Sequence, residues 1–210
     1  MTCAKKTMEL GVLAMLRPDT NPFEVLARYG VKTAQVQNWD MASLTESCAA
    51  AVRQQMAEAG IRPAALWAGY SGRIAWNFID GSDTCGLVPP DLRTRRVDEL
   101  KRGADFARWL GAPAIITHCG FIPENPRDPQ YSPTVNAIYD VAWHCHELGI
   151  GFWFEAGQET PVTLLRTMQD VGLPNPGVNL DTANLILYGR GNPVDALDVI
   201  GPYVRSLHVK

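Results

Sequence analysis

The stretch GIGFWFEAGQETPVTLLRTMQDVGLPNPGVNLD, residues 149–181, contains one complete unit of the pattern that decides the fold. It begins with an apolar run that ends at Glu155. The pair Thr160-Pro161 then opens a segment that closes at a glycine, and a second apolar run ends at Asp181. Threonine caps the free N–H groups of a first helical turn, proline is tolerated at the first helical position, and glycine closes a helix. The stretch therefore predicts strand, helix, strand, which is a βαβ unit.

The same order of signals repeats along the chain. A capping residue followed by proline occurs at Asn21-Pro22, Ser132-Pro133, Thr160-Pro161 and Asn192-Pro193, and Glu24 and Glu46 stand in capping-box spacing after Asn21 and Ser43. Six expected helices end at Gly30, Gly60, Gly111, Gly149, Gly172 and Gly201. Seven expected strands cover residues 10–16, 32–37, 64–70, 114–118, 150–155, 177–181 and 204–209. Repeated βαβ units give a parallel sheet, either doubly wound or closed into a barrel.

Composition excludes several classes of protein. The 210 residues carry 19 Lys and Arg against 22 Asp and Glu, a net charge of −3, and 46% are hydrophobic. A disordered chain has fewer apolar residues, and a nucleic-acid-binding protein needs a basic excess that this chain lacks. We see no interdomain linker and expect one domain over residues 1–210.

The cysteines indicate the redox environment. Their number is odd, and no two stand in CxxC spacing (Cys3, Cys48, Cys85, Cys119 and Cys145). Reduced thiols in a cytoplasmic protein are the simplest interpretation. No apolar run approaches the roughly 18 residues that a membrane helix needs, so we expect no membrane partner. A homo-oligomer is compatible with these features.

Three consecutive expected strands each end in a side chain that can bind a metal: Glu155, Asp181 and His208, which are 26 and 27 residues apart. Each alone has an ordinary structural interpretation, such as a helix cap for the aspartate or a solvent-facing position for the glutamate. Their equivalent placement favours a shared site, because the carboxyl ends of successive barrel strands surround one axis. Two carboxylates and an imidazole suit Mn²⁺, Mg²⁺, Co²⁺ or Zn²⁺.

Other residues at the same ends are candidates for contacting a substrate. His118 ends the fourth strand, and a buried structural histidine is the alternative interpretation. Gln35 lies either at the mouth or in the barrel interior, and Trp67 either walls the pocket or packs in the core. The longest irregular connection, residues 71–91, is expected to form a loop at the mouth of a site.

Three of these motifs together resemble one family: GFWFE at 151–155, GVNLDTAN at 177–184 and LHVK at 207–210. The chain resembles the sugar phosphate isomerase/epimerase family, the xylose isomerase-like TIM-barrel group, and LGAPAIITHCG at 110–120 and GVKTAQVQ at 30–37 fit as well. The resemblance implies a (β/α)8-type barrel with about seven strands present and the last helix and strand missing, because the chain stops within what is usually a His-Val-Lys-Asp motif.

The resemblance also implies an activity. It is a metal-dependent isomerase or epimerase of a sugar or sugar phosphate, acting by proton transfer through a metal-stabilised enediolate. Glu155 would be both metal ligand and catalytic acid/base, while Asn184 and Lys210 would contact the substrate. Asn184 stands where several relatives have a substrate-binding histidine, which leaves the sugar open.

Alternative activities remain. A polyol dehydratase uses similar groups. An apurinic endonuclease-like enzyme on the same barrel would need more histidines and a basic face. Because the family's second glutamate is not in the chain, a catalytically incomplete remnant or binding module is the main alternative.

Overall fold

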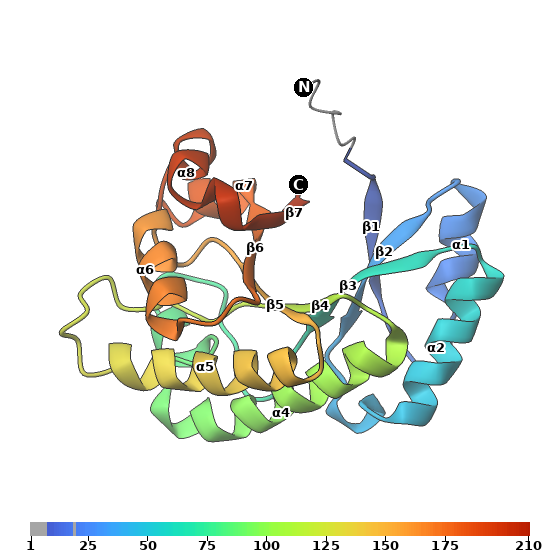
Figure 1. Ribbon diagram of the computed structural model, residues 1–210, viewed down its shortest axis with the longest axis horizontal. Helices are drawn as coiled ribbons and strands as arrows, with labels where there is room; N and C mark the ends of the chain where they lie inside the picture. The colour runs from blue at the N-terminus through green and yellow to red at the C-terminus, as the bar shows by residue number, and fades with distance from the viewer. Residues whose placement is uncertain (1–7, 19) are drawn as a thin grey trace.

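The computed structural model describes residues 8–18 and 20–210, so Cys3 lies outside the described residues. Seven parallel strands form one sheet, and their order in the sheet is their order in the sequence (Figure 1). The strands are β1 (Gly11–Met15), β2 (Thr33–Asn38), β3 (Arg62–Ala68), β4 (Ala114–Thr117), β5 (Gly151–Glu155), β6 (Pro176–Asp181) and β7 (Val204–His208). The predicted seven-stranded α/β barrel-type sheet is thereby confirmed.

Helices connect the strands and lie along the outer side of the curved sheet (Figure 1). They are α1 (Pro22–Arg28), α2 (Glu46–Glu58), α3 (Gly81–Thr84), α4 (Pro90–Leu110), α5 (Tyr131–Glu147), α6 (Pro161–Val171), α7 (Thr182–Leu187) and α8 (Pro193–Ile200), with 3₁₀ turns at Met41–Ser43 and Gly201–Tyr203. The short helices α3 and α7 were not predicted. None of the described helices has the length and apolar character that crossing a bilayer requires.

Three of the four predicted proline-linked caps are confirmed. Asn21, Thr160 and Asn192 cap α1, α6 and α8, and their side chains accept from backbone N–H groups of the first turn. The prediction for Ser132 was wrong, because α5 already begins at Tyr131 and no side chain caps it. Proline is nevertheless tolerated in this first turn, where its N–H would have no partner within the helix.

One further prediction about a helix cap was wrong. Ser43 does not cap α2, because it lies in the preceding 3₁₀ turn, and Thr45 caps the helix instead by accepting from Cys48 N–H. Gly201 does end α8, as predicted, but it is not left-handed, since its φ of −49° and ψ of −44° continue the chain into a 3₁₀ turn. Gly111 and Gly172 do take the left-handed conformation that ends α4 and α6.

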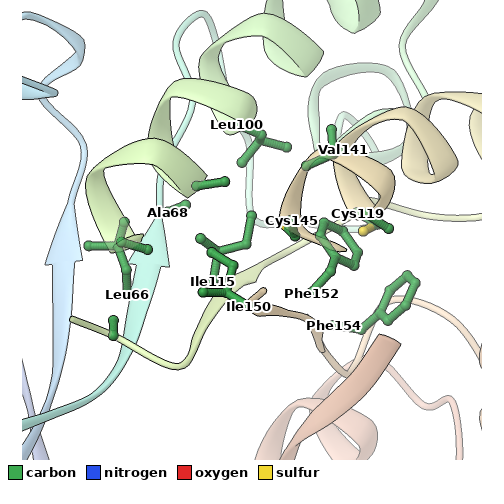
Figure 2. Packing of buried hydrophobic residues seen from close by; sticks show 14 of the residues in the cluster. Leu66, Ala68, Leu100, Ile115, Cys119, Val141, Cys145, Ile150, Phe152 and Phe154 are labelled. Atoms are coloured by element: carbon green, nitrogen blue, oxygen red, sulfur yellow. The ribbon is translucent and has the colours of Figure 1, made fainter. Parts of the chain in front are cut away.

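The main core lies between the sheet and the helices. Figure 2 shows part of it, where Ile115 and Phe152 of neighbouring strands gather with Leu100 of α4 and Val141 of α5; all four are fully buried. Burying each such side chain stabilises the fold by about 1.5–3 kcal/mol. Residues of the opposite parity, such as Trp67 and Ile116, point to the concave side and form a smaller cluster.

Hydrogen bonds between strands that are distant in the sheet cross its concave side. Gln35 of β2 donates from Nε2 to Asn179 Oδ1 of β6 at 3.2 Å and to Ser206 Oγ of β7 at 3.1 Å. These bonds cross the interior, so the sheet curls into an arc rather than lying flat. Within the described residues β1 and β7 form its two edges and do not pair with each other, as expected.

Candidate metal centre

Adjacent strand ends bring Glu155, Asp181 and His208 together. The register places Glu155 opposite Asn179 and Asp181 opposite His208. One ligand atom from each of the three residues lies within 4.8 Å of the others. His208 Nδ1 is 2.5 Å from Glu155 Oε1 and 3.2 Å from Asp181 Oδ2. The predicted convergence of these side chains is therefore a feature of the structure.

Neighbouring polar groups orient both carboxylates. Asn179 Nδ2 donates to Glu155 Oε2, and the backbone N–H of Asn184 donates to Asp181 Oδ1 at 2.9 Å. Lys210 Nζ lies 2.5 Å from Asp181 Oδ2 and donates to Asn184 Oδ1 at 2.8 Å. Asp181 is thus both the N-cap of α7 and a member of the cluster.

The electrostatics follow from burial and close contact. Glu155 and Asp181 are buried, at 2% and 0% exposure. Burial alone would raise the pKa of Asp181, but hydrogen bonds from His208 and Lys210 outweigh it and hold that pKa well below its usual range. Hydrogen bonds to Asp181 and Glu155 raise the pKa of His208 to about 9. The two carboxylates thus strongly favour positive charge beside them, which His208 and Lys210 supply in this structure.

The donor set fits a divalent cation. Two carboxylates and an imidazole nitrogen suit Mg²⁺, Mn²⁺, Co²⁺ or Zn²⁺, and the hydrogen bonds from Asn179 and Asn184 resemble the outer contacts that orient metal ligands. Glu155, Asp181 and His208 are the residues that would hold the ion.

His118 is buried beside this cluster. Its Nδ1 lies 2.8 Å from Gln158 Oε1, and because an amide oxygen only accepts, Nδ1 carries the proton and Nε2 is left as an acceptor. Burial lowers the pKa of His118, against the opposing charge of Glu155, so the ring is neutral at pH 7. Trp67 contacts it edge-on, with ring centroids 5.3 Å apart, and is itself buried.

The remaining candidates divide into two groups. Asn184 and Lys210 lie in contact with Asp181, whereas Gln35 is used in the interior contacts to Asn179 and Ser206. Residues that the sequence did not single out are Asn179, Gln158 and Trp76. Asn179 had a detectable signal, since it lies two residues before Asp181 on the same face of β6. Gln158 and Trp76 lie on loops, where no periodicity marks them.

A parallel βα barrel with acidic and imidazole side chains at its strand ends defines a class of fold whose sites are built at that edge. The family described as the xylose isomerase-like TIM barrel matches residues 23–210, and this chain belongs to that family. No curated protein matches the chain significantly in sequence.

Solved structures agree with this membership. A xylose isomerase domain protein from Planctomyces limnophilus is 36% identical with a TM-score of 0.89, covering 98% of this chain and 74% of its own. A D-psicose 3-epimerase studied with D-fructose is 19% identical with a TM-score of 0.72, covering 96% and 73%. A xylose isomerase-like TIM-barrel protein from Mycobacterium smegmatis in complex with magnesium is 18% identical with a TM-score of 0.66, covering 90% and 65%.

Proposed function

We propose that this chain acts as a metal-dependent isomerase or epimerase of a sugar or sugar phosphate. The observation that carries the proposal is the convergence of Glu155, Asp181 and His208. Two similar structures, a D-psicose 3-epimerase and a TIM-barrel protein in complex with magnesium, support the substrate class and the need for a cation. A bound divalent cation would supply Lewis-acid stabilisation of the negative charge that develops on the substrate oxygens.

The chain's own residues supply proton transfer and positioning. A Glu155 carboxylate oxygen takes the proton from the carbon next to the substrate carbonyl, because a carboxylate held in a nearly dry pocket is a competent base. The protonated Glu155 then returns a proton to carbon, which restores both the carboxylate and the hydrogen count of the sugar. Asn179 fixes the orientation of that carboxylate through Oε2. His118 Nε2 accepts a hydrogen bond from a substrate hydroxyl, and Trp67 holds the imidazole in place.

Asn184 and Lys210 complete the polar side of the site. Their side chains meet at 2.8 Å beside Asp181, so both can donate to substrate oxygens once a cation binds that carboxylate. Gln35 takes part by holding Asn179 through its 3.2 Å hydrogen bond. The small-molecule partner that we propose is therefore a sugar or sugar phosphate, whose oxygens these side chains can meet. The buried free thiols Cys85, Cys119 and Cys145 suit the reducing cytoplasm.

Exchange of a carbon-bound hydrogen with solvent tests this function. The protein is incubated with Mn²⁺ in D₂O with each of the four D-ketohexoses and with their 6-phosphates, and deuterium next to the carbonyl is measured by NMR. We expect incorporation by the wild type and a loss of at least about 100-fold in Glu155→Gln, the usual scale for a general base. Glu147→Gln, an exposed change at the end of α5, is the matched control and retains the activity.

Two outcomes contradict the proposal. Equal exchange in Glu155→Gln and wild type removes Glu155 from the chemistry. A wild type that binds Mn²⁺ but exchanges no hydrogen in any of the sugars supports a binding module instead.

A further inference from the structure

Residues 71–88, which belong to the connection between β3 and α4 and include α3, extend across the mouth of the candidate site; we name this segment the roof loop. Its tip carries three exposed apolar side chains, Trp76, Phe78 and Ile79. The ring of Trp76 lies 4.9 Å from that of His118, and the ring of Phe78 lies 5.5 Å from that of Tyr188, which ends α7. The tip thus touches groups that follow β4 and β6, the strands on either side of Glu155.

Trp76 also reaches the opposite wall of the mouth. Its ring centroid is 6.5 Å from that of Trp39, which follows β2 and lies 5.1 Å from Trp67. These contacts form a continuous aromatic surface from β2 to His118. Within this surface the side chain of Trp76 is 45% exposed, so part of its indole ring is accessible to a ligand.

The roof loop is held at both stems by one buried cation, Arg96 of α4. Its side chain is fully buried and donates to the backbone carbonyls of Ser71 and Arg73 on one stem, at 3.1 and 3.2 Å. On the other stem it donates to the carbonyls of Thr84 and Gly86, at 2.8 and 2.7 Å. A buried guanidinium is costly unless its donors are satisfied, so this arrangement strongly favours one loop conformation.

Two other contacts hold the same stems. The Arg96 guanidinium lies 4.4 Å from the centre of the Tyr70 ring, and the Tyr70 hydroxyl accepts from Gly86 N–H at 2.9 Å. Leu87 N–H donates to the carbonyl of Cys119 at 2.8 Å, which ties the second stem to the residue after His118. The loop is therefore fixed to the strand end whose histidine its tip contacts.

We propose that the roof loop is a fixed wall of the substrate site, that Trp76 is a specificity-determining residue presented by it, and that Arg96 is the positioning residue that holds it. The ligand class is an uncharged ketose, whose C–H face packs on an indole while its hydroxyls meet His118. Arg73 is the one basic residue of the loop and pairs with Asp80 at 3.3 Å, so the loop supplies no unpaired cation for a phosphate group. The substrate assignment rests on the proposed function, whereas the positioning of Trp76 by Arg96 does not.

Kinetics test the role of Trp76. Trp76→Ala should raise KM for the ketose that is turned over about fivefold with little change in kcat, since an aromatic contact contributes on the order of 1 kcal/mol. Trp76→Phe should restore most of the loss. Tyr139→Ala, which removes an exposed aromatic ring from α5, is the control and should leave KM unchanged. A KM in Trp76→Ala equal to that of Tyr139→Ala overturns the specificity role.

Fluorine NMR tests the positioning role without any activity. The protein is labelled with 5-fluorotryptophan, and the resonance missing in Trp76→Phe is assigned to Trp76. Arg96→Lys should move that resonance toward the position of a solvent-exposed fluoroindole. The resonance of Trp153 on β5, assigned in the same way from Trp153→Phe, should stay in place. An unmoved Trp76 resonance in the folded variant overturns the proposal.

Tyr70→Phe provides a second variant should Arg96→Lys not fold. It removes only the acceptor of Gly86 N–H and should move the Trp76 resonance in the same direction; no movement counts against the fixed wall. If the wild type turns over no ketose but its Trp76 resonance responds to these changes, the proposed function is refuted and the positioning of Trp76 by Arg96 stands. If the wild type turns over a ketose but the Trp76 resonance does not respond, the positioning is refuted and the proposed function stands.

Discussion

Glu159 is a carboxyl buried in the loop that follows β5, and it is only 3% exposed. Burial raises its pKa to about 8; the nearby Glu124 carboxylate adds to the shift, and Arg190 opposes it. The folded chain therefore keeps this proton up to about pH 8, whereas the unfolded chain releases it near its ordinary value of 4.5. Between these values the folded state binds more protons, so the free energy of unfolding decreases as the pH rises.

The substitution Glu159→Gln should remove this contribution to the pH dependence of the unfolding free energy. The variant should gain stability over the wild type as the pH rises from 5 to 8, by at most about 1.4 kcal/mol per unit, and the difference should level off above about pH 8. Urea unfolding followed by circular dichroism at several pH values measures it. The exposed Glu147→Gln should run parallel to the wild type, and a parallel curve for Glu159→Gln would contradict the buried-proton interpretation.

At the scale of elements, glycines mark turns for two different reasons. Gly111 ends α4 with a φ of +83°, and a Cβ there would meet no atom within 4 Å. Gly86 in the roof loop has a φ of +66°, and a Cβ there would approach the backbone of Cys119 to 2.0 Å. The first position needs only conformational freedom, whereas the second also needs the space.

Alanine substitutions separate these causes. Gly111→Ala should cost about 1 kcal/mol of unfolding free energy, the usual cost of a left-handed alanine. Gly86→Ala should cost at least about 3 kcal/mol, because strands and loop must also move apart, a change on the scale of core overpacking. Chemical denaturation of both variants measures the difference. Equal costs would show that the roof loop is not packed against β4.

A similar distinction, between local causes and causes that depend on the whole fold, separates what could be predicted from the sequence from what could not. Caps and glycines act within a few residues, so the seven strands and the caps at Asn21, Thr160 and Asn192 could be predicted from local chemistry. Ser132 carries the same local signal, yet α5 begins one residue earlier. Trp76 and Gln158 depend on where Arg96 and His118 lie in space, which no local pattern indicates.

At the scale of the whole molecule, the candidate metal centre joins the last three strands. Glu155, Asp181 and His208 each end one of them, and Gln35 links β6 and β7 back to β2. The strand-end rule for parallel barrels could predict the convergence of these three side chains because it depends on topology alone. A ligand bound by all three residues stabilises only the folded state and raises the melting temperature with its concentration.

Metal addition and removal test this coupling. At 100 times the dissociation constant, Mn²⁺ should add about 2.7 kcal/mol of stability, and EDTA should reverse the gain. Asp181→Asn should abolish the shift while its side-chain oxygen still caps α7, and Asp198→Asn, an exposed change on α8, should keep it. A shift that survives in Asp181→Asn would place the ion elsewhere.

The most direct measurement is an anomalous difference map from crystals of the wild-type chain soaked in Mn²⁺. We predict one strong peak within bonding distance of Glu155, Asp181 and His208, with Lys210 withdrawn from Asp181. A map without a peak at these three side chains, or with the ion bound elsewhere, would contradict the account.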